Sequence, residues 1–162
     1  KKKYKIKLIN EKFPLGTVGS LAKLNKKLTK DFFLCNCDIL INTNYKALYK
    51  FHKEEKFDLT LVCAKKNLKI PYGVCNFNKK GALKKIEEKP EINYFANAGL
   101  YVINPKILKL IPKNKNFNMD DLMVILKKLN KKIGVFPIDS GHWFDIGEWS
   151  QYHRTIDYYK SE

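Results

Sequence analysis

Residues 31–66, DFFLCNCDILINTNYKALYKFHKEEKFDLTLVCAKK, contain the pattern that decides the fold. Residues 31–41 are a nearly unbroken apolar run, residues 44–55 have a helical sequence that is polar on one side, and residues 58–66 are apolar again. A continuous apolar run is typical of a strand buried on both faces in a parallel sheet. Strand, helix and strand in succession therefore predict an α/β fold.

The rest of the chain continues this alternation. Residues 72–90 predict a hairpin with its turn at residues 78–81. Further strands are predicted over residues 4–9, 95–103, 133–138 and 142–147, and further helices over residues 20–28, 105–111, 118–130 and 148–159. The leucines that share a helical face are Leu21, Leu24 and Leu28, then Leu122, Leu126 and Leu129, with Asn118 as the N-cap of their helix. The pattern predicts one three-layer α/β domain with a mixed sheet over residues 1–162.

Composition and charge narrow the class of protein. Hydrophobic residues make up 44% of the chain, as in a globular domain, but no apolar run reaches the roughly 18 residues of a membrane span. The first residues alternate lysine with apolar residues, unlike a signal peptide, so we expect a soluble, cytoplasmic protein with no membrane partner.

The net charge of +16 raises nucleic acid as a possible partner. Arg154 is the only arginine, however, and the lysines are spread along the whole chain. Proteins that read bases usually use arginine, so a basic nucleic-acid-binding protein is the less favoured interpretation.

The cysteines are Cys35, Cys37, Cys63 and Cys75. Their spacing lacks the second ligand pair of a zinc site. We expect reduced, buried thiols, with Cys35 and Cys37 on one face of a strand.

Two aspartates end apolar strands in a way that suits a metal. Asp38 follows the run at residues 32–37, and Asp145 follows two aromatic residues. If their carboxylates converge, they form a site for Mg²⁺, which takes one or two carboxylates with waters and phosphate oxygens. The alternative is that each aspartate caps an unrelated turn.

Charged and small residues elsewhere suit a sugar phosphate. A carboxylate such as Glu88 can accept hydrogen bonds from sugar hydroxyls, and the ammonium group of Lys89 suits a phosphate. At Tyr72 and Gly73 a sugar ring can lie against the backbone. Gly16 precedes a predicted helix and lets a flat ligand approach. The alternatives are a solvated charge cluster and an ordinary turn.

Six motifs occur in one order along the chain: PLGTVGSL, FFLCNCDIL, YGVCNF, EEKP, NAGLYVI and WFDIG. In that order and spacing they resemble the sugar-1-phosphate nucleotidyltransferases, most of all the branch of the mannose-1-phosphate guanylyltransferases. The chain is also similar to the glucose-1-phosphate thymidylyltransferases. The resemblance runs from about residue 4 to residue 159 and implies a Rossmann-like nucleotide-diphospho-sugar transferase fold.

The resemblance also implies roles for residues. Asp38 and Asp145 bind Mg²⁺, Lys89 meets the sugar phosphate, and Asp38 and Lys89 are the catalytic pair. The remaining residues implied to bind substrate are Gly16 and Thr17 at the nucleobase and Tyr72, Gly73, Glu88, Asn97, Ala98 and Gly99 at the sugar. Cys37 stands where the family often has glycine, which narrows the approach to the base.

The implied reaction transfers a nucleotidyl group, guanylyl in this branch, from an NTP to a sugar-1-phosphate, with pyrophosphate leaving. The family's glycine-rich loop, G-G-x-G-T-R-L followed by Lys-Pro, is absent from these residues. We therefore expect an N-terminally truncated chain, the C-terminal two-thirds of a catalytic domain, that is inactive alone and needs an oligomer or the missing N-terminal segment. The alternative is a catalytically incomplete fragment that binds sugar phosphates or another protein.

Overall fold

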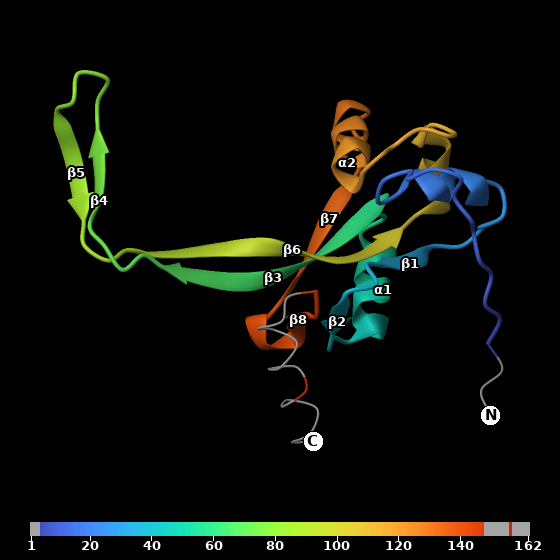
Figure 1. Cartoon of the computed structure of the whole chain (residues 1–162). Helices are drawn as coiled ribbons and strands as arrows, with labels where there is room; N and C mark the ends of the chain where they lie inside the picture. The colour runs from blue at the N-terminus through green and yellow to red at the C-terminus, as the bar shows by residue number, and fades with distance from the viewer. Residues whose placement is uncertain (1–3, 148–155, 157–162) are drawn as a thin grey trace. The chain divides into compact units, whose positions relative to one another are not determined.

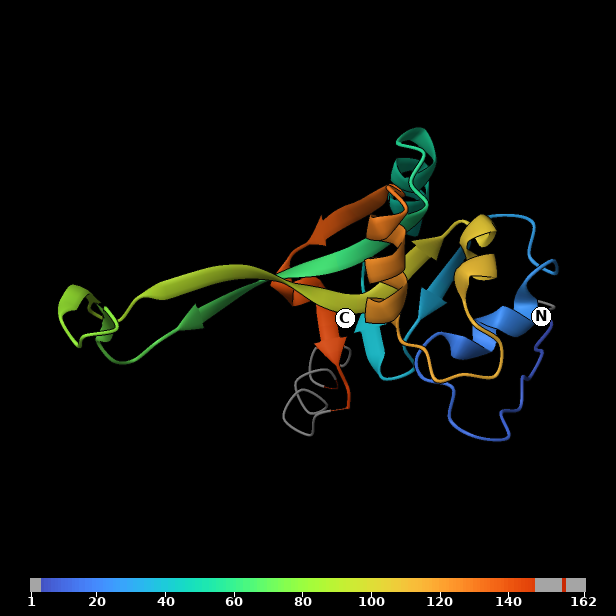
Figure 2. The ribbon, with the colours of Figure 1, turned by 90° about the horizontal axis from the view of Figure 1, so that it is seen from above.

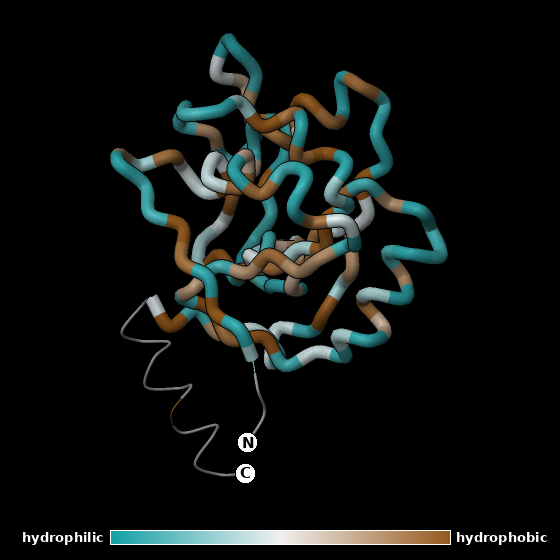
Figure 3. The backbone as a smooth tube through the Cα atoms, turned by 90° about the vertical axis from the view of Figure 1, so that its right-hand side faces the viewer, coloured by the Kyte–Doolittle hydropathy of each residue, from teal (hydrophilic) through white to brown (hydrophobic). Residues whose placement is uncertain are grey.

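A computed structural model describes residues 4–147 and residue 156 (Figure 1). The contacts divide these residues into two compact units. The first unit comprises residues 4–34, 46–60 and 101–134, and the second comprises residues 35–45, 61–100 and 135–147. Along the backbone, hydrophobic and hydrophilic stretches alternate throughout, as expected of a chain that folds into short strands and helices (Figure 3).

The main sheet has four strands in the order β1-β6-β3-β7. Their bounds are Phe32–Cys35 for β1, Glu91–Ile103 for β6, Leu59–Lys69 for β3 and Ile133–Ile138 for β7. The strands β3 and β6 lie side by side and lead to a hairpin of β4 (Val74–Phe77) and β5 (Leu83–Glu87) (Figure 2). A separate antiparallel pair joins β2 (Ile39–Ile41) to β8 (Trp143–Asp145).

The helices of the first unit supply much of its core. They are η1 (Gly19–Leu24), α1 (Tyr45–Glu54), η2 (Pro105–Leu110) and α2 (Met119–Lys128), of which η1 and η2 are 3₁₀ helices. Leu48 of α1, Ile107 and Leu108 of η2, and Leu122 and Leu126 of α2 are at most 1% exposed. In the second unit a short 3₁₀ helix, η3 (Ser140–His142), precedes β8.

Local sequence signals located several elements correctly. The predicted helices at 44–55 and 118–130 are α1 and α2, and the Asn118 backbone N–H donates to the Asp121 carboxylate over 2.9 Å at the start of α2. The hairpin turn is also confirmed: the Asn78 side-chain oxygen accepts from the N–H groups of Lys80 and Ala82 over 2.9 and 3.0 Å. An Asn that bonds the backbone just after it is a common turn signal.

The prediction of one buried strand over residues 31–41 is wrong. The chain leaves β1 after Cys35 and forms β2 only at Ile39, and Phe33 and Leu40 remain 40% and 38% exposed. The cause lies outside the segment, because β2 pairs with β8 and not within the four-stranded sheet.

The predicted strand at residues 4–9 is also wrong. This stretch is irregular, with Tyr4, Ile6 and Leu8 between 74% and 86% exposed. Alternation favours a strand only where a neighbouring strand can satisfy the backbone groups. The helix predicted at 20–28 is shorter than expected, since η1 ends at Leu24, and Leu129 lies beyond α2 and is 50% exposed.

The cysteines correct a further prediction. All four are free, but only Cys63 is buried, whereas Cys35, Cys37 and Cys75 are exposed. Cys37 lies in the break between β1 and β2 and so is not on a strand at all. The helix predicted at 148–159 lies outside the described residues, except for Ile156. Between residues 4 and 147 no helix combines the length and apolar character that a membrane crossing requires.

Candidate functional site

The antiparallel pair β2–β8 in the second unit positions the two aspartates. Ile39 is the register partner of Asp145, so Asp38 immediately precedes the paired position. The Ile146 N–H donates to the Asp38 carbonyl oxygen over 2.9 Å, just beyond the last register pair. Backbone hydrogen bonds therefore hold both aspartates at the same end of this strand pair.

Their carboxylates converge on Gly147. A Cβ atom placed on Gly147 would lie 3.2 Å from Asp145 Oδ1 and 3.6 Å from Asp38 Oδ2. The Gly147 N–H donates to Asp145 Oδ1 over 3.0 Å, which fixes the orientation of that carboxylate. Two aspartates that are distant in the sequence thus present oxygens to one small volume, which glycine leaves free of side-chain atoms.

The donor set fits Mg²⁺. Asp38 is exposed and Asp145 half-buried, so solvent reaches the pair. Within residues 4–147 no group of three or more His, Cys, Asp and Glu side chains is suited to a metal. Mg²⁺ needs only one or two carboxylates and fills its other positions with water and phosphate oxygens. A site of two accessible carboxylates has that composition.

A second group of predicted residues lies around Gly73. A Cβ atom on Gly73 would lie 3.0 Å from Glu88 Oε2, so the structure brings these two residues together. Lys89 follows with φ of +44°, a left-handed conformation that is uncommon for lysine, and Pro90 accepts a hydrogen bond from the Ile70 N–H over 3.1 Å. Tyr72 is 74% exposed and available to a ligand.

The segment Asn97–Gly99 packs against a residue that the sequence did not single out, Asn36. The Asn36 N–H donates to the Gly99 carbonyl oxygen over 3.0 Å, and the Gly99 N–H donates to Asn97 Oδ1 over 3.1 Å. Gly99 has φ of +75°, and a Cβ atom there would lie 2.9 Å from Asn36 Nδ2. This position requires glycine for both reasons. Ala98 is 1% exposed, so its side chain serves the core.

A further contact beside the aspartates was also not predicted from the sequence. Lys66 Nζ lies 4.5 Å from the ring centroid of Trp143, two residues before Asp145. A cation over an indole face is a favourable pairing. The only hint in the sequence is that Trp143 belongs to the WFDIG motif.

Gly16 and Thr17 lie in the first unit, where they join the start of α2. The Thr17 N–H donates to Asn118 Oδ1 over 3.1 Å, and the Met119 N–H donates to Thr17 Oγ1 over 2.9 Å. Gly16 has φ of +75°, and a Cβ atom there would lie 2.6 Å from Asn118 Oδ1. Gly16 and Thr17 therefore have a structural function at the start of α2, independently of any ligand that they bind.

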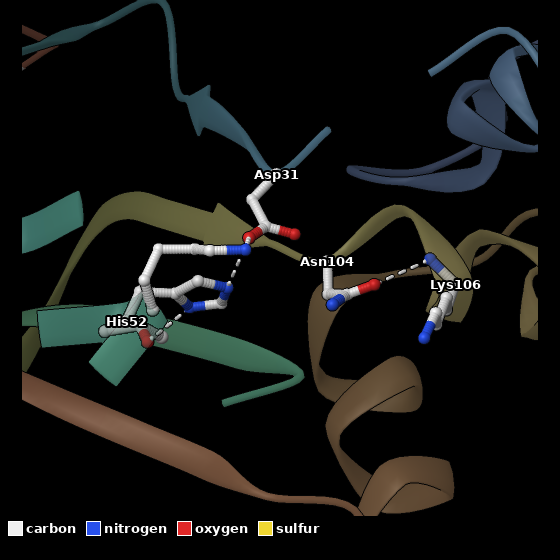
Figure 4. A network of polar contacts seen from close by, with 6 residues as sticks. Asp31, His52, Asn104 and Lys106 are labelled. Carbon is white, nitrogen blue, oxygen red and sulfur yellow. Dashed lines mark hydrogen bonds and ion pairs between the residues drawn. The ribbon is translucent and has the colours of Figure 1, made fainter. Parts of the chain in front are cut away.

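The first unit also contains a buried polar group that the sequence did not predict (Figure 4). His52 is 1% exposed; its Nδ1 lies 2.8 Å from Thr60 Oγ1 and its Nε2 lies 3.8 Å from Asp31 Oδ2. Lys53 Nζ contacts the same Asp31 oxygen at 2.9 Å. Burial lowers the pKa of His52, although the Asp31 charge opposes this, while the hydrogen bond to Asp31 raises the pKa of Lys53.

Curated relatives are mannose-1-phosphate guanylyltransferases. The catalytic subunit beta of Drosophila melanogaster is 30% identical over 155 residues, which are 91% of this chain and 41% of the relative. The mannose-1-phosphate guanyltransferase of Debaryomyces hansenii is 31% identical over 145 residues, which are 85% of this chain and 40% of the relative. The chain thus spans about two fifths of the length of these relatives.

Solved structures establish the fold. HddC from Yersinia pseudotuberculosis matches with a TM-score of 0.65 and 22% identity, covering 92% of this chain and 64% of HddC. The same protein complexed with GMP-PN matches with a TM-score of 0.65, covering 93% and 65%. The predicted α/β class, a Rossmann-like nucleotide-sugar transferase fold with a mixed sheet, is confirmed. A family profile described as nucleotidyl transferase matches residues 1–162, as the motifs indicated, and the chain belongs to this family.

Proposed function

We propose that the chain forms part of an enzyme that transfers a guanylyl group from GTP to a sugar-1-phosphate. The observation that carries this proposal is the convergence of the Asp38 and Asp145 carboxylates beside Gly147 in a member of the nucleotidyl transferase family. Guanine and a mannose-type sugar are favoured because the curated relatives are named mannose-1-phosphate guanylyltransferases.

In this proposal Asp38 and Asp145 hold Mg²⁺, with the Gly147 N–H keeping one carboxylate in place. A Mg²⁺ ion held there would supply positive charge to offset the negative charge of the phosphate oxygens and of the departing pyrophosphate. Because Gly147 has no side chain, the space in front of both carboxylates remains open to the phosphate groups.

The sugar phosphate is bound by residues near the β4–β5 hairpin. Glu88 accepts hydrogen bonds from sugar hydroxyls, and the adjacent Gly73 lets the ring approach the backbone. Lys89 meets the sugar phosphate, where its positive charge offsets the repulsion between two anionic substrates. Asn97, Ala98 and Gly99 are assigned to the sugar as well, and Asn36 holds this segment through the Gly99 carbonyl oxygen.

The reaction needs no covalent enzyme intermediate. An oxygen of the sugar-1-phosphate attacks the α-phosphorus of GTP, the bond from that phosphorus to the bridging oxygen breaks, and pyrophosphate leaves with the electron pair. The contribution of the protein is positioning and charge neutralisation. Gly16 and Thr17 border the guanine base in this proposal, with Thr17 held by Asn118 and Met119.

The test is a pyrophosphate-release assay on the enzyme of which this chain forms part, with GTP, Mg²⁺ and a panel of hexose-1-phosphates. We expect the Asp145→Asn variant to lose about 10²–10³-fold in kcat, because such sites depend on preorganised charge. Asp120→Asn is the matched control, since Asp120 is exposed on α2 and changes charge equally. Wild-type kcat in Asp145→Asn, or equal losses in both variants, would reject the proposed site.

A further inference from the structure

A cavity of about 400 Å³ lies in the first unit, and none of the residues assigned to the proposed transfer reaction lines it. Three lysines line it from three different parts of the chain: Lys30 before β1, Lys53 in the last turn of α1, and Lys106 in η2. Its volume falls within the range of small-molecule pockets, roughly 300–1,000 Å³. The cavity is thus large enough for a small anion and carries the charge to attract one.

One carboxylate in the lining holds a lysine in place but does not neutralise the positive charge of the cavity. The Asp31 side chain is 5% exposed and contacts Lys53 Nζ at 2.9 Å. Behind it lies His52, itself 1% exposed and bonded to Thr60. Three lysines and one aspartate leave a net charge of +2 on the lining. Neither Lys30 nor Lys106 forms an ion pair within the described residues.

A fourth group supplies a neutral donor. Asn104 Oδ1 accepts from the Lys106 N–H over 3.0 Å, which fixes the side-chain amide (Figure 4). Among the described residues its NH₂ group has no acceptor, so it can donate to a ligand. Asn104 and the Asp31–Lys53 pair are therefore held in place before a ligand arrives. Preorganised donors bind at a lower entropic cost than mobile surface lysines.

We propose that this cavity binds a phosphate group, either as inorganic phosphate or pyrophosphate or as the phosphate of a small organic ester. Lysine ammonium groups bind phosphate as point charges, and an amide adds a directed hydrogen bond. The net positive lining excludes a metal cation as the occupant. This inference is independent of the proposed transfer reaction, since none of the residues assigned to that reaction lines the cavity.

A second basic cavity in the same unit provides a control. It measures about 330 Å³ and is lined by Lys23, Lys26 and Lys113, but by no acidic residue. Lys23 Nζ is already bonded to the Asn10 carbonyl oxygen over 2.9 Å. If anions bind only through general attraction to a chain of net charge +16, they should bind in both cavities alike. If they bind through preorganised groups, they should bind only in the cavity that contains Asp31.

The experiment is an isothermal titration of the purified protein with phosphate, pyrophosphate and glycerol phosphate at constant ionic strength. EDTA is present, so that no metal recruits the anions to Asp38 and Asp145. The test variant is Lys30→Gln/Lys106→Gln and the matched control is Lys26→Gln/Lys113→Gln. All four lysines are exposed, so both variants should fold, and circular dichroism checks this.

We expect the wild type to bind at least one anion with Kd below about 1 mM. The test variant should weaken this by about tenfold or more, and the control by less than about twofold. Tighter binding of glycerol phosphate than of pyrophosphate would identify an organic ester as the ligand class. Tighter binding of pyrophosphate would identify an inorganic anion. Equal losses in the two variants, or no binding by the wild type, would overturn the proposal.

Discussion

The two units differ in the groups that surround their carboxylates. In the first, the Asp31 side chain is 5% exposed, and its Oδ2 lies 2.9 Å from Lys53 Nζ and 3.8 Å from His52 Nε2. In the second, Asp38 and Asp145 approach each other, and within residues 4–147 neither forms an ion pair. A carboxylate with its cation already in place stabilises a fold, whereas two like charges held together favour binding of a cation. This difference distinguishes Asp31, which is a structural group, from Asp38 and Asp145, which form a candidate metal site.

Filling the space at Gly147 should have the largest effect. In Gly147→Val the new side chain enters the volume that Asp38 and Asp145 share, where even its Cβ atom would lie 3.2 and 3.6 Å from their oxygens. We expect kcat for pyrophosphate release to fall by at least about 10²-fold. Gly141→Val is the control in the same unit, since a Cβ atom at Gly141 meets nothing within 4 Å. If both variants keep wild-type kcat, the open volume is not used in catalysis.

Lys89→Ala should have a smaller effect, and on one substrate only. Loss of one charge-assisted contact is worth roughly 1.5–3 kcal/mol, which is about 10- to 150-fold in the use of sugar-1-phosphate. Steady-state kinetics with each substrate varied separately measures this, and the KM for GTP should stay within about twofold. Lys84→Ala, at an exposed position on β5, is the control. An unchanged kcat/KM for the sugar phosphate in Lys89→Ala would remove Lys89 from the site.

The smallest predicted effect concerns stability and the buried group of the first unit. Burial lowers the pKa of His52 in the folded state, so below the ordinary pKa of about 6.5 the unfolded chain binds the proton more readily. Acidification through this window should reduce the free energy of unfolding by at most about 1.4 kcal/mol per pH unit, until the folded-state pKa is reached.

Urea unfolding at several pH values between 7 and about 5 measures this dependence. His52→Gln should flatten it, whereas His142→Gln, at an exposed position in the second unit, should leave it unchanged. A wild-type dependence in His52→Gln would show that other groups cause the loss of stability.

The sequence predicted what local signals control. The Asn118 cap located α2, and the Asn78 turn located the β4–β5 hairpin, because both depend on bonds to nearby backbone. Asp38 and Asp145 could be selected because carboxylates at the ends of apolar runs are uncommon without a partner.

The break between β1 and β2 could not be predicted, since Asn36 bonds to Gly99 and β2 pairs with β8, both far along the chain. The same holds for the Asp31–His52 contact, which arises only when α1 packs. Sequence patterns indicate which residues need a hydrogen-bond or ion-pair partner, but the tertiary structure determines which residue that partner is.

Paramagnetic broadening by Mn²⁺, followed on backbone amide signals of the full chain, compares the two units directly. Carboxylates take up Mn²⁺ as they do Mg²⁺, and amides near the bound ion lose signal first. Our account predicts early loss at Ile146 and Gly147 in the wild type, retention of those signals in Asp38→Asn/Asp145→Asn, and wild-type behaviour in Asp120→Asn. Early loss around Asp31, or undiminished broadening at Gly147 in the double variant, would contradict it.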